Sequence, residues 1–495
     1  MSERQFYAEY IYNAFALEMQ SFSIVQWQFI LYNEQMTYFF ETYGCEMNIA
    51  ESASVEQILI SRGWKKAENA QLADLVVINT CSVRGSAEER IFGRLGFFSG
   101  LKKVRSCAPD AKKRNMEIAA EYVQKNGAVP LTLIVMGCMA ERLLKSLQKQ
   151  WPCVDYVVGT FAKNKFGEII QAVEEGQKYI QTDEEPVYVF AETSYEEGAF
   201  STFVPIMHGC NNFCSYCIVP YVRGREVSRP VEQILHELDV LARRGVKEIT
   251  LLGQNVNSYK GADGMNFPNL LKTICRHLEQ TNSPIEWIRF ESSNPKDFSD
   301  ELIDVIAEEK RICRGLHIAV QHGSNSILKA MNRKYTREQY LLLVQKLRER
   351  IPEIQLTTDI MLGFPGETEE DFEQAASLMK EVEFESAFMY YYNPREGTPA
   401  AKMQNQIPLE VKKERLQKII DIQLGITRKV MEKQVGKNIK VLADIISRDN
   451  ANELLGKTEQ NERIAFEAPV SLIGKFVQVH IDSLNGNTFK GSLVH

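Results

Sequence analysis

The sequence predicts an α/β protein with three successive folded parts: an N-terminal parallel-sheet domain, a partial TIM-like (β/α)6 barrel and a small C-terminal β-barrel. Short apolar runs bounded by polar residues, with apolar residues at helical spacing between them, predict the first two parts. Short strand-like segments separated by Gly and Asn turns predict the third. We expect domains at 37–175, 196–430 and 433–495, preceded by an extension at 1–36 that contains none of the motifs described below.

The N-terminal part is predicted to form one parallel sheet. Residues 75–78 read Leu-Val-Val-Ile between polar residues, as expected of a strand buried on both faces. A helix is expected at 50–62, where apolar residues recur at helical spacing before Gly63. The strands are expected at 38–43, 74–79, 131–136 and 156–158. Strands that alternate with helices in this way pair in parallel.

Six further strand-and-helix units predict the partial barrel. Its strands are expected at 203–207, 248–252, 287–291, 316–320, 356–362 and 387–392, with helices such as 231–244 and 337–350 between them. In barrels of this kind the chemistry lies at the carboxyl ends of the strands. A charged amphipathic helix at 410–435 leads to the tail, whose strands are expected at 440–446, 463–466, 476–481 and 488–493.

A cysteine loop directly follows the first barrel strand. Cys210, Cys214 and Cys217 have the spacing C-x3-C-x2-C, and the loop contains no fourth cysteine or histidine. A structural zinc site is closed by four protein ligands. Three thiolates around a four-iron cluster instead leave one iron free to bind a cofactor. The alternative, a zinc knuckle completed by His208 or by a distant residue, stays open at this point.

A second set of cysteines lies in the N-terminal part. Cys45, Cys81 and Cys138 each follow a predicted strand, so they are expected at one edge of the same sheet. Three thiolates there predict a second cluster with an open iron. The alternative is three buried cysteines that act as small apolar residues. The remaining cysteines are interpreted as non-ligands: Cys107, Cys153, Cys275 and Cys313.

These motifs resemble those of the radical S-adenosylmethionine (SAM) methylthiotransferases. The resemblance rests on the segments around each cysteine, which are 43–48, 79–84, 137–140 and 209–230. Further segments resemble the tRNA-modifying MiaB branch of that family: 253–259, 331–336, 357–367 and 393–399. The resemblance covers residues 38–495, except for a segment near 97–130 that looks longer than usual.

The resemblance implies an N-terminal methylthiotransferase domain, a radical SAM barrel and a C-terminal TRAM domain. It implies that the protein adds a methylthio group to carbon 2 of N6-isopentenyl (dimethylallyl) adenosine, next to the anticodon in tRNA. The implied partners are the tRNA anticodon loop and an electron donor such as flavodoxin or ferredoxin. We expect a cytoplasmic monomer without a membrane partner, because the chain lacks a long apolar run and its cysteines do not suggest a disulfide framework.

The resemblance also implies the cofactors, which are two 4Fe-4S clusters and SAM. The cluster on Cys210, Cys214 and Cys217 would bind SAM through its open iron and donate one electron, splitting SAM into methionine and a deoxyadenosyl radical. The cluster on the upstream cysteines would supply the sulfur, methylated first by another SAM. Catalytic residues beyond the cluster ligands are not assigned.

Polar residues at the strand ends are expected to line the SAM pocket. The candidates are Gln254, Ser292, Gln321, Asp359 and Gly363. At Gly363 the absence of a side chain permits close backbone approach to a ligand. The alternative is that these residues cap the following helices or form turns.

The net charge of −7 excludes a strongly basic field that would attract nucleic acid from all sides. Contacts to RNA are therefore expected from local basic elements, namely Arg223, Arg225 and Arg229 after the cysteine loop and the charged helix over 412–433, where Lys412, Lys413 and Arg415 are the residues to test, with the tail contributing shape and hydrogen bonds. The tail is neutral, so only the family resemblance supports RNA binding there.

Two other functions stay open from the sequence. One is a related methylthiotransferase that acts on a threonylcarbamoyl adenosine or on an aspartate of a ribosomal protein. The segments 43–48 and 82–84 favour the isopentenyl-adenosine branch over it. The other is a cluster-bearing RNA-binding protein that senses redox state. Two three-thiolate sets and a full barrel argue for an enzyme instead.

Overall fold

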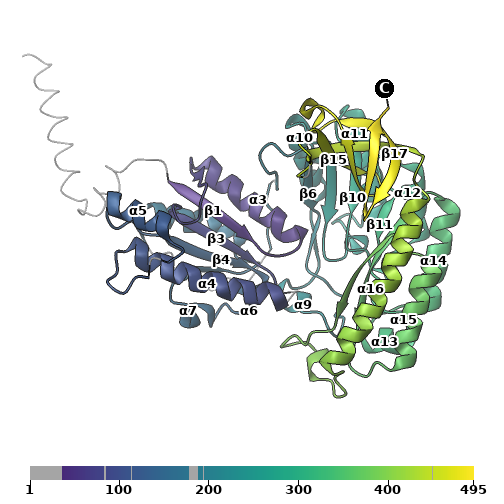
Figure 1. Ribbon diagram of the computed structural model, residues 1–495, viewed down its shortest axis with the longest axis horizontal. Coiled ribbons are helices and arrows are strands. Elements are labelled where there is room, and N and C mark those ends of the chain that lie inside the picture. The colour runs from purple at the N-terminus through teal and green to yellow at the C-terminus, as the bar shows by residue number, and fades with distance from the viewer. Residues whose placement is uncertain are drawn as a thin grey trace, which may run out of the picture. The chain divides into compact units, whose positions relative to one another are not determined.

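The computed structural model describes residues 36–82, 85–112, 114–177, 188–192, 194–448 and 450–494 (Figure 1). The extension expected at 1–36 lies outside the described residues, apart from Met36. The chain divides into two compact units. The first comprises the residues up to Tyr43, Val55–Thr80 and Glu88–Val189, and the second comprises Gly44–Ser54, Cys81–Ala87 and Phe190–His495. Two short segments with Cys45 and Cys81 thus group with the second unit.

The first unit is built on a five-stranded parallel sheet with the order β2-β1-β3-β4-β5. Its strands are β1 (Thr37–Thr42), β2 (Lys65–Lys66), β3 (Leu75–Thr80), β4 (Thr132–Gly137) and β5 (Tyr156–Val158). The four strands expected from the sequence are confirmed. The edge strand β2 escaped prediction because it is only two residues long and exposed.

Helices cover both faces of this sheet. Residues of α4 (Gly85–Arg105) and α5 (Glu117–Asn126) share one apolar core with one face. Residues of α3 (Glu46–Ser61) and α8 (Phe166–Glu174) share another core with the opposite face. The short helices α6 (Cys138–Arg142) and α7 (Leu147–Gln150) complete the unit. The expected helix at 50–62 begins earlier than predicted, at Glu46, directly after Cys45.

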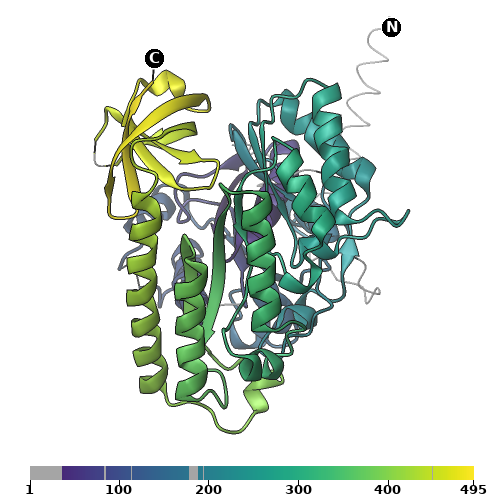
Figure 2. The same ribbon diagram turned by 90° about the vertical axis from the view of Figure 1, so that its right-hand side faces the viewer.

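The second unit contains the predicted partial barrel (Figure 2). Its parallel strands are β6 (Ser201–Pro205), β9 (Glu248–Leu252), β10 (Trp287–Phe290), β11 (Gly315–His317), β12 (Gln355–Leu362) and β13 (Ser386–Tyr391). They form two three-stranded sheets, β10-β9-β6 and β11-β12-β13, joined by the parallel bridges Ile288↔Ile312 and Ser293↔Ile318. Within the described residues, β6 and β13 are the two edges, so the barrel is open.

Helices pack on the outside of the barrel and bury its main apolar core. They are α10 (Val231–Arg243), α11 (Phe267–Gln280), α12 (Asp300–Glu308), α13 (Asn325–Ala330), α14 (Arg337–Arg350), α15 (Glu369–Val382) and α16 (Leu409–Glu432). A two-stranded ribbon, β7 (Met207–His208) with β8 (Val227–Ser228), and the short α9 (Val219–Val222) frame the cysteine loop.

The chain ends in a closed five-stranded barrel with the order β14-β15-β16-β18-β17. Its strands are β14 (Asn438–Ile446), β15 (Glu453–Thr458), β16 (Arg463–Glu467), β17 (Phe476–Asn485) and β18 (Thr488–Leu493). Four of them were expected, whereas β15 was not. The hairpin between β15 and β16 contacts the amino-terminal end of the partial barrel, where Arg289 donates to the carbonyls of Thr458 at 2.8 Å and Glu459 at 2.6 Å.

Candidate functional site

The cysteine loop is held in a defined backbone shape at the carboxyl end of the partial barrel. Gly209 has φ +80°, and a Cβ there would lie 2.1 Å from the carbonyl oxygen of Arg225, so only glycine fits. Phe213 also has positive φ, +48°, and Asn332 Nδ2 donates to its carbonyl at 2.9 Å. The Ser215 amide and hydroxyl donate to the carbonyls of Met331 at 3.0 Å and Ala330 at 2.8 Å.

The three thiols of this loop are buried or half-buried, and none forms a disulfide. Burial, with the nearby Cys214, raises the pKa of Cys217 to about 12. Burial likewise raises the pKa of Cys210. Two donors face the sulfurs, Arg333 Nη1 toward Cys214 at 3.4 Å and Asn212 Nδ2 toward Cys210 at 3.5 Å. Thiols this close together resist ionisation unless a cation is bound among them, because a coordinated metal deprotonates its thiol ligands.

The donor set, three free thiols in one loop, has the chemistry of the three protein ligands that a four-iron cluster with one open iron needs. In the described part of the chain, no three His, Cys, Asp or Glu side chains converge on one point that could hold a single metal ion. A four-iron cluster does not require such convergence, since each thiolate binds a different iron. His208, the fourth ligand of the zinc alternative, instead lies with Nδ1 3.4 Å from Arg223 Nη1.

Two of the upstream cysteines directly follow paired residues of neighbouring strands. Thr80 of β3 pairs with Gly137 of β4, and Cys81 and Cys138 are the next residues of the two strands. Gly137 has φ +95°, and a Cβ there would lie 2.5 Å from the Thr80 carbonyl oxygen, so the two strand ends meet closely. In the second unit, Cys45 and Cys81 are near enough to interact electrostatically. The strand register thus agrees with the expectation for the strands that precede Cys81 and Cys138, and a shared site for all three cysteines stays a prediction.

The predicted SAM contacts occupy different surroundings. Gln254 braces the cysteine loop, because its Oε1 accepts a hydrogen bond from the Gly209 amide at 2.6 Å. Ser292 and Gln321 have φ of +66° and +71°, a left-handed backbone that is unfavourable for these residues. Such strained residues gather at functional sites, where the surrounding structure holds them in place. Gly363 has φ +65°, and Lys412 Cγ lies 2.3 Å from where its Cβ would be.

A polar network on the inner wall of the barrel joins two of these residues to others that the sequence did not single out. Gln321 Nε2 donates to Asp359 at 3.3 Å, and the Tyr390 hydroxyl donates to Gln321 Oε1 at 3.1 Å. His317 Nε2 lies 3.6 Å from Asp359. Burial alone lowers the pKa of His317, but the bond to Asp359 and nearby carboxylates raise it above its usual value. Burial and Glu46 raise the pKa of Glu291 to about 7.

The structure corrects the expected RNA contacts after the cysteine loop. Arg223 is buried and donates to Glu51 at 2.7 Å. Arg229 is buried and paired with Glu237, while also donating to backbone carbonyls. Neither guanidinium can reach a phosphate, so the prediction is wrong for both. Arg225 is exposed, with its guanidinium 4.4 Å from the centre of the Phe213 ring, and it stays a candidate.

The same correction applies to the charged helix α16. Lys412 is 6% exposed and donates to the Tyr392 carbonyl at 3.0 Å. Arg415 is 7% exposed and donates to Glu367 at 2.8 Å. The predicted phosphate contacts are therefore wrong for these two residues, because both side chains point into the protein to satisfy buried oxygen atoms. Lys413 is exposed.

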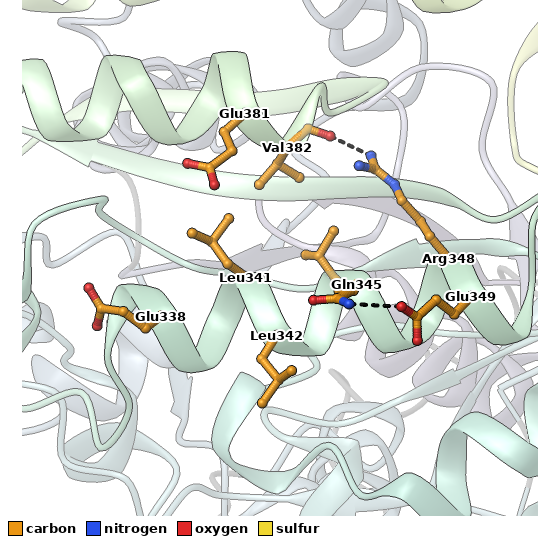
Figure 3. A pocket seen from close by; sticks show the side chains of 9 residues that line it. Glu338, Leu341, Leu342, Gln345, Arg348, Glu349, Glu381 and Val382 are labelled. Carbon is orange, nitrogen blue, oxygen red and sulfur yellow. Dashed lines mark hydrogen bonds between the residues drawn. The ribbon is translucent and has the colours of Figure 1, made fainter.

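A shallow hollow of about 640 Å³ lies elsewhere, between α14 and α15 on the outside of the barrel (Figure 3). It is lined by Glu338, Leu341, Leu342, Val344, Gln345, Arg348, Glu349, Glu381 and Val382. None of these is a predicted site residue, and none is a cysteine. The hollow therefore adds no residue to the candidate site.

Three family models match successive parts of the chain. Residues 37–159 match the model described as "Uncharacterized protein family UPF0004", residues 204–379 match the Radical SAM superfamily, and residues 432–494 match the TRAM domain. The radical SAM methyltransferase TsrM from Kitasatospora setae shares the fold, with a TM-score of 0.51 and 16% identity over 74% of this chain and 77% of that one. Fold and cysteine loop together define a radical SAM protein with a TRAM domain.

Curated relatives refine this class. Two relatives are named tRNA-2-methylthio-N(6)-dimethylallyladenosine synthase. The protein from Treponema pallidum (strain Nichols) is 52% identical over 93% of this chain and 99% of the relative. The protein from Treponema denticola is 50% identical over 92% of this chain and 100% of the relative. The protein of that name from Acetivibrio thermocellus is 40% identical over 92% and 91%. The chain belongs to the family of tRNA-2-methylthio-N(6)-dimethylallyladenosine synthases. No helix in the described part of the chain could span a membrane.

Proposed function

We propose that this protein attaches a methylthio group to carbon 2 of N6-dimethylallyladenosine, next to the anticodon of tRNA. The observation that carries the proposal is the identity of about half of all residues, over nearly the whole chain, with enzymes of that name. The loop with three thiols at the carboxyl end of the barrel provides the ligands for a cluster that can bind SAM. The polar wall beside it provides groups that can orient a ligand.

We propose that Cys210, Cys214 and Cys217 hold a 4Fe-4S cluster that binds SAM, and that Cys45, Cys81 and Cys138 hold a second cluster. When bound, the first cluster and SAM supply the one-electron chemistry that an unactivated C–H bond requires, and the second supplies sulfur. The chain's own residues fix the loop geometry. Asn332 and Gln254 hold the loop backbone, and the Arg333 guanidinium offsets the negative charge of the Cys214 thiolate.

The SAM contacts stay proposals of the same kind. Ser292 and Gln321 present polar groups from strained strand ends, and Asp359 is oriented by Gln321 and His317. Gly363 keeps the backbone at its strand end free of a side chain. Gln254 is best assigned an indirect part, because its carboxamide oxygen already accepts from the cysteine loop.

The tRNA contact is proposed to rest on local groups rather than on total charge, which is −7. Arg225 and Lys413 are exposed cations on this unit, and the TRAM barrel adds a further surface. Single-stranded loops with splayed bases are the usual targets of specific RNA recognition, which suits an anticodon loop.

We further propose that the protein is a cytoplasmic monomer that receives electrons from a flavodoxin- or ferredoxin-like donor.

The test is to analyse tRNA nucleosides from a strain that lacks this gene by mass spectrometry. We expect loss of the 2-methylthio derivative, with accumulation of N6-dimethylallyladenosine, and restoration when the intact gene is returned. Anaerobic protein with SAM, a reductant and dimethylallylated tRNA should form the same product. An unchanged nucleoside profile, or loss of a threonylcarbamoyl derivative instead, would refute the proposal. RNA binding without deoxyadenosine formation from SAM would favour the redox-sensor alternative.

A further inference from the structure

The inner wall of the barrel carries an aromatic side chain that no neighbouring element covers fully. In β13, Ala387 and Met389 pack against the main core beneath the outer helices, so Phe388 and Tyr390 face the opposite side. The register places Phe388 beside Asp359 of β12 and Tyr390 beside Met361. His317 lies on the same side, because its neighbour Leu316 is buried in the main core. Phe388 therefore belongs to the interior of the barrel.

The exposure of this ring is unusual for its position. Side chains inside such a barrel normally fill it, yet Phe388 is 58% exposed. The edge of the His317 ring meets it with a centroid separation of 5.8 Å and an interplanar angle of 63°. Neighbouring polar groups are engaged with each other: His317 with Asp359, and Tyr390 with Gln321. On this wall the Phe388 ring is therefore the most open apolar surface, Tyr390 being 36% exposed, and the neighbouring polar groups are already hydrogen-bonded or paired.

Phe388 lies on β13 only a short way from the residue that interacts with the cysteine loop. Tyr390 is near enough to Cys217 to interact electrostatically, and Phe388 stands two residues before it in the same strand. Two residues of a strand span about 7 Å. In adenine, carbon 2 and the carbon that bears N6 lie on either side of N1, so a base whose carbon 2 faces the cysteine loop directs its N6 substituent away from the loop along the wall. A ligand group there meets the Phe388 ring.

We propose that Phe388 determines specificity by packing against the dimethylallyl group of the target adenosine. This inference rests on the proposed function, which supplies the identity of the substrate. A branched five-carbon alkenyl group has no hydrogen-bonding atoms, so only apolar contact can distinguish a dimethylallylated base from an unmodified one. Among the described inner-wall residues of β11, β12 and β13 named above, Phe388 offers the most exposed apolar surface.

The test compares two anticodon stem-loop RNAs that differ only in the dimethylallyl group, using the full-length, anaerobically reconstituted protein. Dissociation constants and single-turnover rates are measured for wild type, Phe388→Ala and Phe388→Leu. One methylene more or less on a substrate changes discrimination in an apolar pocket by about 10–200-fold. We expect Phe388→Ala to reduce the preference for the dimethylallylated RNA at least about 10-fold, and Phe388→Leu to restore most of it.

The matched control is Leu342→Ala, which removes an apolar side chain of similar exposure, 52%, from the outer helix α14. It should leave the preference unchanged, and iron content and melting temperature should match wild type in all variants. An unaltered preference in Phe388→Ala would overturn the inference. Equal loss for both RNAs would also overturn it, since the ring would then stack on the base itself. If the wild-type protein prefers the dimethylallylated RNA but forms no methylthio product, the proposed function is refuted and the inference about Phe388 is not.

Discussion

Arg223 and Glu51 form a buried two-point ion pair, although they are 172 residues apart in the chain. Nη1 and Nη2 of Arg223 donate to the two Glu51 carboxylate oxygens at 2.7 and 3.3 Å, and both side chains are only 3% exposed. Glu51 lies in α3, which begins directly after Cys45, and Arg223 follows the cysteine loop of the barrel. The pair therefore fastens the Cys45 segment to the barrel within the second unit.

Removing one partner of this pair should destabilise the segment strongly. Glu51→Ala leaves a buried guanidinium without its carboxylate, which costs about 3–5 kcal/mol. We expect the amides at the start of α3 to lose hydrogen-exchange protection by a corresponding factor. The double variant Glu51→Leu/Arg223→Met removes both charges and should be clearly more stable than either single variant. Additive effects of the two changes would contradict the pairing.

The two sets of cysteines should be separable by iron content and by product. The reconstituted protein should bind about eight irons, four per cluster. Replacing Cys210, Cys214 and Cys217 by Ala should retain about half of the iron and abolish reductive cleavage of SAM. Replacing the upstream set instead should leave SAM cleavage intact and abolish the methylthio product. Cys275→Ala and Cys313→Ala, at buried cysteines outside both sets, serve as controls and should keep all iron. Loss of all iron from either triple variant would contradict two independent sites.

The strand ends were predictable because short apolar runs between polar residues carry the signal of a buried parallel strand. That signal placed β3 and β4, and therefore Cys81 and Cys138, on neighbouring strand ends. The same signal is missing in β15. Only one apolar side chain of that strand, Leu454, is fully buried, and a glycine, Gly456, packs against Val441 where a second apolar side chain would be expected.

Side-chain partners were not predictable, because they depend on how residues that are not adjacent in the sequence meet in the folded chain. Arg223, Arg229 and Arg415 look like surface cations in the sequence, yet each is paired with a buried carboxylate from another element. Phe388 gave no signal either. Its strand reads Ser-Ala-Phe-Met-Tyr-Tyr, so five of six residues are apolar or aromatic and neither face is marked as open.

Replacing Arg225 should weaken the salt dependence of tRNA binding, as the loss of a phosphate contact does. Replacing a buried cation should not. Each phosphate contact to a single-stranded nucleic acid contributes about 0.7 to the slope of log K against log salt. Arg225→Gln should lower the slope by about that amount, and so should Lys413→Gln if that exposed cation reaches the backbone. Arg415→Gln should reduce the melting temperature and leave the slope intact, since this guanidinium pairs with Glu367 and Glu369. A lower slope in the Arg415 variant alone would place the phosphate contact on α16.

Docking of the TRAM barrel should weaken as pH rises, because two buried carboxyl groups meet at the contact. Burial, reinforced by Glu462, raises the pKa of Glu385 well above its usual value, although Arg289 opposes the shift. Burial also raises the pKa of Glu462, against hydrogen bonds from Gln355 and Thr458 and the charge of Lys437. One oxygen of each carboxyl group has no hydrogen-bond partner among the described residues.

The sign of the effect follows from these raised values. At pH values above the unfolded pKa of about 4.3, the folded state binds more protons than the unfolded state. The contribution of these two carboxyl groups to stability is therefore fully present below that pH and is lost as the pH rises through their folded pKa. Glu462→Gln removes the ionisable group while retaining its shape. It should raise the melting temperature at pH 7–8, by about 1 °C for each kcal/mol gained in a chain of this length, and should have little effect near pH 4. Glu453→Gln, at a partly exposed carboxylate paired with Lys490, is the control and should not reproduce this pH dependence. A Glu462→Gln variant that melts lower at neutral pH would mean that the carboxylate is ionised and stabilising in the folded protein.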